Sequence, residues 1–264
     1  MKERILVFIP CYNCMNQITR VIDQFTPDIL DLIDNVLIIN NQSTDQTQEV
    51  VINHISNNPE LIEKFIVLRN HQNYGLGGSH KVAFNYATEN DFDFVIILHG
   101  DDQGSIKDII HFIKEGKHKN VDALLGARFH PQSTIPGYSA FRTFGNKVFN
   151  LLFSISLFKT IYDLGSGLNC YKVAILKNRF FHKFPDDLTF NYCMVMAHAS
   201  YNHNIDFFPI TWREDDQISN VKLFPQAQRV LTMLLKYTFL RKLFLISEMR
   251  NSIIDKYDAK IVLP

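Results

Sequence analysis

The chain has 264 residues, of which 46% are hydrophobic, and this is enough to build the core of one large α/β unit. Its 27 basic and 27 acidic residues cancel, which argues against nucleic acid as a partner because no overall field attracts a polyanion. No apolar stretch near Met1 is long enough for a signal peptide, so a cytoplasmic location is expected.

Strand and helix patterns alternate along the first half of the chain. Strands are expected at 5–10, 35–39, 65–68 and 94–98, and helices at 15–25, 43–55 and 80–87. Strands separated by helices of this length form right-handed βαβ units, so a mainly parallel sheet is predicted.

Polar residues follow three of these strands, at 11–13, 40–42 and 99–103. The carboxyl ends of parallel strands meet along one edge of a sheet, and open α/β sheets bind their ligands there. The sequence therefore predicts a binding site built from these three segments.

The segment 94–103, FVIILHGDDQ, is the most informative of the three. A buried strand ends there in His99, Asp101 and Gln103, and carboxylate and amide oxygens are hard ligands suited to Mg²⁺ or Mn²⁺. The alternative is a polar turn in which Asp102 caps a helix at 105–113.

The cysteines allow a second kind of chemistry. Cys11 and Cys14 form a C-x-x-C pair after the first strand, but a zinc site needs a second pair, and Cys170 and Cys193 stand far apart. A thioredoxin-like dithiol stays open, and ordinary cytosolic thiols are favoured.

The segments 9–13, 40–47, 73–75 and 99–103 resemble, in order and spacing, the motifs of family-2 glycosyltransferases with a GT-A fold. Further on, 126–128, 142–146 and 163–168 look like the later motifs of the dolichyl-phosphate mannose synthase branch. The resemblance covers 5–212. It implies an α/β, Rossmann-like nucleotide-binding domain over 1–215 with a mainly parallel central sheet, followed by a helical C-terminal extension over 216–264.

The resemblance also implies roles for single residues. The pocket for the base and ribose of a nucleotide-sugar donor would be lined by Pro10, Tyr12, Asn13, Asn40 and Asn41. Donor contacts are also expected from Asn73, Gly75, Asp101 and Arg128, the last through a bidentate contact with phosphate.

Two departures from the family pattern stand out. Asn40 and Asn41 replace a pair of aspartates, which leaves the base open among uridine, the favoured one, guanosine and cytidine. The metal motif Asp-x-Asp-x-Gln here reads His99-x-Asp101-x-Gln103, so these three residues are the expected ligands of Mn²⁺ or Mg²⁺, with Asp101 the firmest.

A hydroxyl acceptor needs a carboxylate base, and relatives often carry it on the helix after Phe184 and Pro185. Asp186 and Asp187 are the first candidates for this catalytic role, and Glu214, Asp215 and Asp216 follow. Helix capping and a solvated charge run are their alternative interpretations. A phosphate acceptor needs no base, so a polyprenyl phosphate stays open.

Two apolar segments bear on membrane contact. The stretch 148–158 is shorter than the roughly 20 residues that span a bilayer. The stretch 223–246 is apolar with Lys236, Arg241 and Lys242, a pattern typical of a helix lying on the inner face of the cell membrane. Packing on the catalytic domain or on a second copy of the chain, as a homo-oligomer, explains it equally well.

The resulting hypothesis is a metal-dependent inverting glycosyltransferase that moves a sugar from a nucleotide sugar to a hydroxyl of a glycan or lipid-linked intermediate. Such a reaction belongs to the biosynthesis of cell-surface polysaccharides or glycoconjugates. A nucleotidyltransferase would carry a glycine-rich basic loop at 11–17, which is missing. A catalytically inactive nucleotide-binding or scaffolding homologue also stays open, given Asn40, Asn41 and His99.

Overall fold

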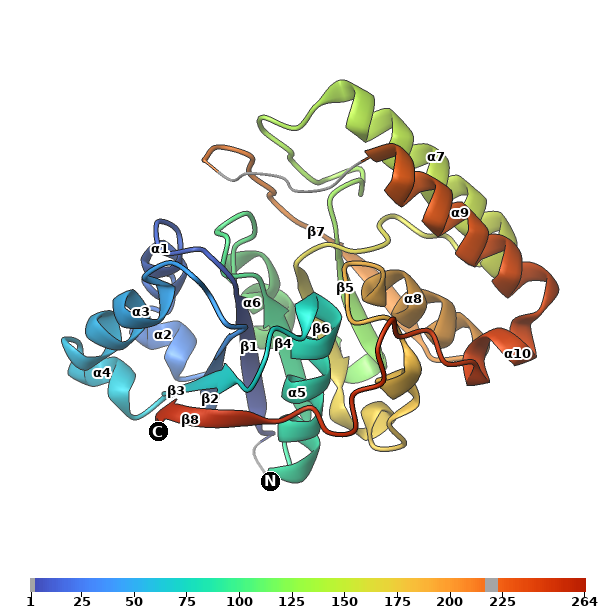
Figure 1. The fold of residues 1–264 in the computed structure, drawn as a ribbon. Helices are drawn as coiled ribbons and strands as arrows, with labels where there is room; N and C mark the ends of the chain where they lie inside the picture. Colours follow the sequence, from blue (N-terminus) through green and yellow to red (C-terminus); the bar gives the residue numbers. More distant parts are fainter. Residues whose placement is uncertain (1–2, 217–222) are drawn as a thin grey trace.

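The computed structural model describes residues 3–216 and 223–264. In this part of the chain one sheet contains eight strands in the order β7-β5-β6-β4-β1-β2-β3-β8 (Figure 1). The strands are β1 (Ile5–Cys11), β2 (Asn35–Asn40), β3 (Phe65–Asn70), β4 (Phe94–Leu98), β5 (Ala123–Ala127), β6 (Leu168–Lys172), β7 (Ile205–Pro209) and β8 (Ala259–Leu263).

The centre of this sheet is parallel, as predicted. Strand β1 pairs in parallel with β2 and β4, and β2 pairs in parallel with β3. Strands β6 and β8 run antiparallel to their neighbours β4, β5 and β3. The carboxyl ends of β1, β2, β3 and β4 therefore meet along one edge.

Helices cover both faces of the sheet (Figure 1). One face carries α1 (Ile18–Ile22), α2 (Pro27–Leu30), α3 (Thr47–Ser56), α4 (Pro59–Ile62) and α6 (Lys107–Lys114). The other side carries α5 (Gly75–Glu89), α7 (Ala140–Leu157), α8 (Phe190–Ser200), α9 (Leu223–Phe239) and α10 (Arg241–Ile246). Short 3₁₀ helices lie at Lys117–Asn120, Val173–Leu176 and Phe180–Lys183.

Because side chains alternate along each strand, the sheet has one hydrophobic core on each face. In β1, Leu6 and Phe8 pack on the α5 side, whereas Val7 and Ile9 pack on the α3 side. Successive side chains of a strand point to opposite faces, so a fully apolar strand supplies both cores at once. This double burial fixes the register of β1 and thereby the place where its polar end emerges.

Several predicted boundaries change in the structure. The helix expected at 15–25 is limited to α1, and the helix expected at 80–87 begins earlier, at Gly75. The stretch 223–246 is two helices, α9 and α10, separated at Leu240. The extension after 215 is also not wholly helical, because β8 returns to pair with β3. The domain boundary at 215 stays a prediction.

The start of α5 lies very close to the segment that leads into α8. The backbone N–H groups of Gly77 and Gly78 donate to the carbonyl of Asp186 at 2.8 and 3.2 Å. A Cβ at Gly77 would collide with the carbonyl oxygen of Pro185 and would lie 2.7 Å from Cβ of Phe190. Glycine is therefore required here by close approach.

Gly77→Ala is expected to lower the free energy of unfolding by about 1–3 kcal/mol, the usual range for overpacking. Gly145→Ala on α7 is the matched control, since a Cβ there meets nothing within 4 Å and alanine favours helix by up to about 1 kcal/mol. Urea unfolding of both variants measures this difference. Equal stability of the two variants would contradict the close packing of α5.

Candidate active site

A cleft of about 1030 Å³ opens at the carboxyl ends of the central strands. The polar residues after β1 and β4 line it, together with residues from the starts of α5, α7 and α8. Of the predicted site residues, those that line the cleft are Pro10, Tyr12, Asn13, Asn41, Asn73, Gly75, His99, Asp101, Gln103, Arg128 and Asp187. The sequence thus predicted the location of the cleft, while Asn40 and Asp186 are absent from its wall.

Hydrogen bonds to the turn after β2 fix the segment after β1. Asn13 has a φ of +52°, and its Oδ1 accepts a hydrogen bond from the Thr44 backbone N–H at 2.8 Å. Asparagine tolerates this left-handed conformation better than most residues. Beside it the ring of Tyr12 is half exposed and lines the cleft, where it offers a flat aromatic face to a ligand.

Asn40 has a structural role in the turn after β2. Its Oδ1 accepts from the backbone N–H of Ser43 at 2.9 Å, and its Nδ2 donates to Gln48 at 3.1 Å. Both ends of the amide are thus occupied within the protein. The prediction that Asn40 lines the donor pocket finds no support in this geometry, because the side chain faces the turn.

Asn41 does line the cleft, as part of an amide cluster. Its Oδ1 accepts from Asn70 Nδ2 at 2.8 Å and from the Tyr74 backbone N–H at 2.9 Å. Its Nδ2 donates to Asn73 Oδ1 at 2.8 Å, which also accepts from the Gly75 backbone N–H. The residues after β2 and β3 are thereby locked together at the wall of the cleft.

Asp101 lies on the cleft wall directly after β4. Burial raises the pKa of its carboxyl to about 6, so the group is ionised above that pH and its charge is poorly solvated. The negative charge of the neighbouring Asp102 raises this pKa further. A divalent cation would relieve the cost of this buried charge.

His99 and Gln103 flank Asp101 in the same cleft. Burial lowers the pKa of His99 to about 4, so the imidazole is neutral at pH 7. Its Nε2 is buried without a hydrogen-bond partner in the described part of the protein. Gln103 donates through Nε2 to the carbonyl of Arg213 at 3.2 Å, which fixes the direction of its amide.

The donor atoms of these three side chains are of types that a divalent cation shared with a ligand accepts. They offer a carboxylate, an amide and a neutral imidazole, all of which Mn²⁺ accepts. Among the described residues no group of three or more His, Cys, Asp or Glu could hold a metal ion by itself. Substrate phosphate oxygens would have to complete the coordination, as is usual for such ions.

Asp102 does not cap the following helix, so that alternative is wrong. The N-cap of α6 is Ile106, and the Asp102 carboxylate is buried between Arg20 and Arg213, at 2.7 Å from each. Asp102 has a φ of +59° and does not line the cleft, whereas the neighbouring Asp101 does. Two adjacent aspartates thereby have different environments, and Asp102 ties the strand end to the segment after β7.

The contacts of Arg128 differ from those predicted from the sequence. Its Nε and Nη2 pair with the two oxygens of the buried Asp163, each at 2.8 Å. The bidentate edge of the guanidinium is therefore used within the protein, although Arg128 still lines the cleft. A phosphate could meet only the remaining N–H groups, so this arrangement does not support the predicted bidentate contact, which stays a prediction.

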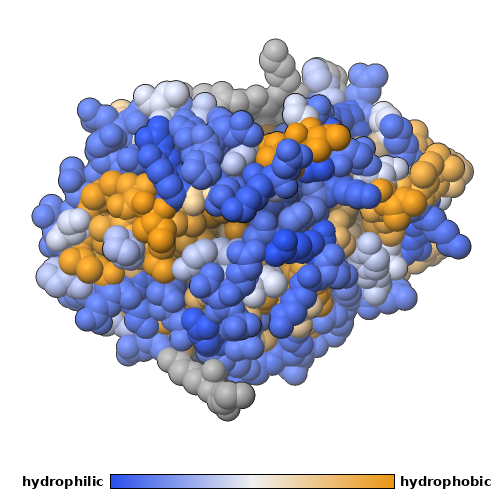
Figure 2. All heavy atoms as spheres, turned by 60° about the horizontal axis from the view of Figure 1, so that its bottom comes forward, coloured by the Kyte–Doolittle hydropathy of each residue, from blue (hydrophilic) through white to orange (hydrophobic). Residues whose placement is uncertain are grey.

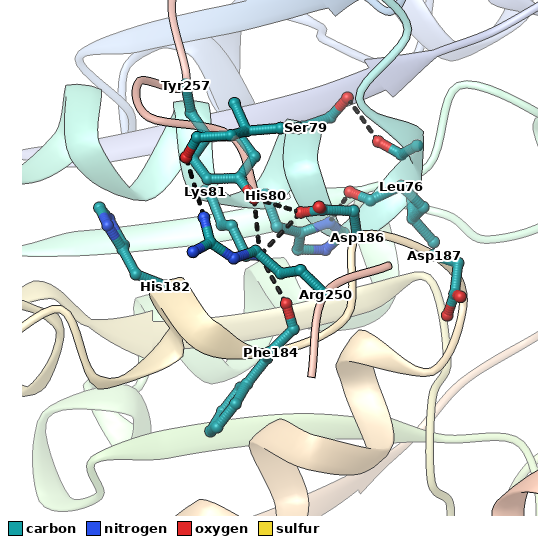
Figure 3. A network of polar contacts seen from close by, with 12 residues as sticks. Leu76, Ser79, His80, Lys81, His182, Phe184, Asp186, Asp187, Arg250 and Tyr257 are labelled. Carbon is teal, nitrogen blue, oxygen red and sulfur yellow. Dashed lines mark hydrogen bonds and ion pairs between the residues drawn. The ribbon is translucent and has the colours of Figure 1, made fainter. Parts of the chain in front are cut away.

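The two aspartates before α8 point in different directions (Figure 3). Asp186 Oδ1 accepts from Lys81 Nζ and from Tyr257 OH, both at 2.7 Å. Burial lowers the pKa of Lys81 to about 8, yet the ammonium stays charged at neutral pH. Asp186 thus joins α5 to the segment before β8, which explains its absence from the cleft wall.

Asp187 turns away from this network and lines the cleft (Figure 3). Its Oδ1 accepts from the Thr189 backbone N–H at 2.9 Å, and its Oδ2 pairs with Arg229 at 2.6 Å. Burial alone would raise the pKa of Asp187, but the hydrogen bonds from Thr189 and the charge of Arg229 outweigh it and lower the pKa. The carboxylate is therefore ionised at neutral pH.

The other carboxylates considered from the sequence lie after β7. Glu214 pairs with Arg142 of α7 at 2.6 Å, and Asp216 pairs with Arg20 at 2.9 Å. Both line the cleft, whereas the exposed Asp215 does not. These ion pairs connect the segment after β7 to α7 and to α1.

The cysteines do not form a reactive pair. Cys11, Cys14, Cys170 and Cys193 are all buried free thiols. Burial, together with its contact to Cys14, raises the pKa of Cys11 well above its ordinary value, so the nucleophilic thiolate is disfavoured. The interpretation as ordinary thiols is the one that fits.

A family model of known proteins matches this chain. Residues 6–180 match the model described as Glycosyl transferase family 2. The match covers more than half of the sequence, and the chain belongs to this glycosyltransferase family. The family resemblance and the enzyme class predicted from the motifs after β1, β2 and β4 are confirmed.

Solved structures give the same fold. Glucosyl-3-phosphoglycerate synthase from Mycobacterium tuberculosis, in complex with Mn²⁺, uridine diphosphate and phosphoglyceric acid, superposes with a TM-score of 0.63 at 12% identity, over 89% of this chain and 78% of that one. Mannosyltransferase PcManGT from Pyrobaculum calidifontis, in complex with GDP-Man and Mn²⁺, gives 0.58 at 18% identity, over 92% of this chain and 65% of that one. The predicted GT-A fold is confirmed.

Proposed function

We propose that the protein is a metal-dependent inverting glycosyltransferase that moves a sugar from a nucleotide sugar, with UDP-sugars favoured, to a hydroxyl of a glycan or lipid-linked intermediate. The supporting observation is that one cleft contains the amide cluster of Asn41 and Asn73, the carboxylate of Asp101 and the carboxylate of Asp187. Donor, metal and acceptor functions can therefore operate on a single substrate complex.

The metal would be held by Asp101, with Gln103 and His99 as further ligands. Mn²⁺ is supported by the two superposed structures, which contain it beside a nucleotide. When bound, it would neutralise the charge that develops on the leaving diphosphate. Arg128, fixed by Asp163, would donate hydrogen bonds to the diphosphate from its remaining N–H groups.

Asp187 is the proposed general base. Its ionised carboxylate lines the cleft, and its partners are Thr189 and Arg229, whereas Asp186 pairs with the fully buried Lys81. For a hydroxyl acceptor, Asp187 would take the proton as the oxygen attacks the anomeric carbon. The ion pair with Arg229 of α9 would orient the carboxylate toward the acceptor.

The acceptor side of the cleft continues into an exposed apolar surface. Exposed residues of α7 recur at three- and four-residue spacing, at Phe141, Phe144, Val148, Leu151, Ile155 and Phe158 just after its end. On the neighbouring helices the exposed apolar residues are Leu231, Leu235, Phe239, Leu240, Leu243 and Ile246. Phe141 and Val230 of the same helices line the cleft itself.

The charges of this surface suggest what covers it. The sequences of α7, α9 and α10 contain six Lys and Arg and no Asp or Glu, whereas the whole chain is neutral. Two of the six, Arg142 and Arg229, pair with Glu214 and Asp187 at the cleft, which leaves Lys147, Lys236, Arg241 and Lys242 for the surface. Figure 1 shows α7 and α9 side by side, and Figure 2 shows apolar side chains at the end of the molecule that carries α9 and α10. We propose peripheral contact with an anionic membrane and hence a lipid-linked acceptor. In the described part of the chain, no helix is long and apolar enough to cross a bilayer.

The donor proposal is tested by screening UDP-, GDP- and CDP-sugars for thermal stabilisation and for donor hydrolysis, with and without Mn²⁺. A ligand at a hundred times its Kd adds about 2.7 kcal/mol, so a donor that binds raises the melting temperature measurably. Stabilisation that needs Mn²⁺, together with sugar release, supports the proposal. Binding without any hydrolysis or transfer would favour the catalytically inactive homologue.

The membrane proposal is tested by flotation with vesicles that contain anionic phospholipid. The double variant Ile155→Ser and Phe239→Ser should lose most vesicle binding, because both side chains are exposed on the proposed surface. Ile261→Ser on β8 is the matched control, since its side chain is as exposed but lies elsewhere. A concentration-dependent dimer that the double variant abolishes, without vesicle binding, would instead assign the surface to a second copy of the chain.

A further inference from the structure

We infer that the side-chain amide of Asn73, held in one orientation by Asn41, reads the nucleobase by donating a hydrogen bond to a ring carbonyl oxygen such as O4 of uracil. This inference rests on the proposed function, because it takes the cleft to be a nucleotide site. It assigns a chemical effect to Asn41, which stands where the family pattern has an aspartate.

The first step concerns the orientation of Asn41. An amide side chain can be turned so that its nitrogen and oxygen exchange places, and only its partners decide between the two. The Tyr74 backbone N–H lies 2.9 Å from one end of this amide, and a backbone N–H can only donate. That end is therefore the oxygen, and Nδ2 must face Asn73.

The second step transfers this orientation to Asn73. The atom of Asn73 that meets Asn41 Nδ2 at 2.8 Å also meets the Gly75 backbone N–H at 2.9 Å. Two donors converge on it, so it is the oxygen. The remaining end of the amide is the NH₂ group, for which no hydrogen bond is found among the described residues.

The NH₂ group is placed where a ligand can meet it. Asn73 is exposed to solvent and lines the cleft, where its Oδ1 contacts Asn41. The amide therefore costs little to desolvate, and a ligand atom that accepts its hydrogen bond replaces only water. The fixed oxygen end means that Asn73 can offer a donor but no acceptor without breaking two hydrogen bonds.

The third step concerns the other cleft residues that could form hydrogen bonds with a base near Asn73. The acidic residues that line the described cleft are Asp101, Asp187, Glu214 and Asp216, which follow β4, precede α8 or follow β7. The cleft residues after β1, β2 and β3 include no Asp or Glu. A base at this part of the wall would meet amides, and its carbonyl groups, not its amino groups, would find a partner in Asn73.

Uracil and cytosine differ in the group that the ring carries at C4. Uracil has an acceptor oxygen at C4, whereas cytosine has an amino group that can only donate. An NH₂ group facing that position favours uracil, and a carboxylate there would favour cytosine. Asn73→Asp makes this exchange with no change in size, and its oxygens can still accept from Asn41 and Gly75.

Asn41→Asp should act through Asn73. A carboxylate at 41 can still accept from Tyr74 and Asn70, but it repels Asn73 Oδ1 and favours the turned amide, which presents oxygen to the cleft. Asn41 is thus a positioning residue with the same predicted direction of effect. A residue with a merely structural role would weaken both nucleotides without changing their ratio.

The test is calorimetric titration of the full chain with UDP and with CDP in the presence of Mn²⁺. The unmodified protein should bind UDP more tightly than CDP, and Asn73→Asp should lower this preference at least tenfold, the effect of about one exchanged hydrogen bond. Asn41→Asp should lower it in the same direction. Asn16→Asp, which adds the same charge at another exposed residue of the cleft, should weaken both nucleotides equally.

The outcomes separate two failures. If the unmodified protein binds UDP with Mn²⁺ but Asn73→Asp keeps the ratio of the two dissociation constants, the reading by Asn73 is overturned and the glycosyltransferase proposal stands. A ratio that Asn16→Asp changes as much as Asn73→Asp also overturns it, because charge alone would then explain the effect. If no nucleoside diphosphate binds, the proposed function falls together with the inference.

Discussion

Asp101→Asn is expected to abolish nearly all sugar transfer while the protein stays folded. The side chain lies on the cleft wall, and burial raises the pKa of its carboxyl. Asparagine keeps its size but removes the charge that holds the cation, so both metal binding and stabilisation of the leaving diphosphate weaken. A loss of about 10²–10³-fold or more in kcat is expected, as for removal of other preorganised electrostatic groups.

The measurement is transfer at saturating donor, with Mn²⁺ binding followed in parallel by titration. The matched control is Asp108→Asn on α6, another partly buried aspartate with a raised pKa, which does not line the cleft. The control should keep its turnover. Near-normal turnover of a well-folded Asp101→Asn protein would remove Asp101 from the metal site.

Asp187→Asn is expected to lower kcat by about 10²–10⁴-fold, the usual effect of losing a general base. Donor affinity should barely change, because Asp187 lies beside α8 and α9 and not in the amide cluster. The base works in its ionised form, so the rate should fall as the pH falls through its pKa. Since that pKa is lowered, the fall should begin below the ordinary range of an aspartate.

Asp186→Asn is the natural comparison, because the two residues are adjacent and only Asp187 lines the cleft. This variant weakens the partner of the buried Lys81, and a lower unfolding free energy, by about 1–3 kcal/mol, is expected. Its kcat should stay within a few-fold of the unmodified protein. A mild effect of Asp187→Asn, equal to that of Asp186→Asn, would favour an acceptor that needs no base, such as a polyprenyl phosphate.

The central sheet could be predicted from the sequence because the signals are local. The strand at 94–98 is a continuous apolar run that ends in polar residues, and its bounds agree with β4. The cleft followed from the same signal, since parallel strands bring their carboxyl ends together. The short strand β8 was missed because five residues with a lysine among them carry little pattern.

The roles of Arg128 and Asp186 could not be predicted in the same way. Each is decided by a partner distant in the sequence, Asp163 for the first and Lys81 for the second. Whether a charged side chain faces a ligand or a buried counter-ion depends on tertiary contacts that no local motif encodes. The roles of the adjacent Asp101 and Asp102 were equally unpredictable. Asp101 lines the cleft, whereas Asp102 pairs with Arg20 and Arg213.

Strand β8 has a consequence for how the molecule behaves in solution. It occupies the outer edge of β3, whose backbone N–H and C=O groups would otherwise be open to strands of other molecules. The opposite edge is formed by β7, a short strand that carries the exposed Asp206 and ends in Pro209. A charge and a proline both discourage edge pairing. On the other side the border is β8 itself, which has five residues and carries Lys260, so it is a short edge with a charge. Neither border is therefore a long, wholly apolar edge, and shortening the protein before β8 would expose the edge of β3 instead.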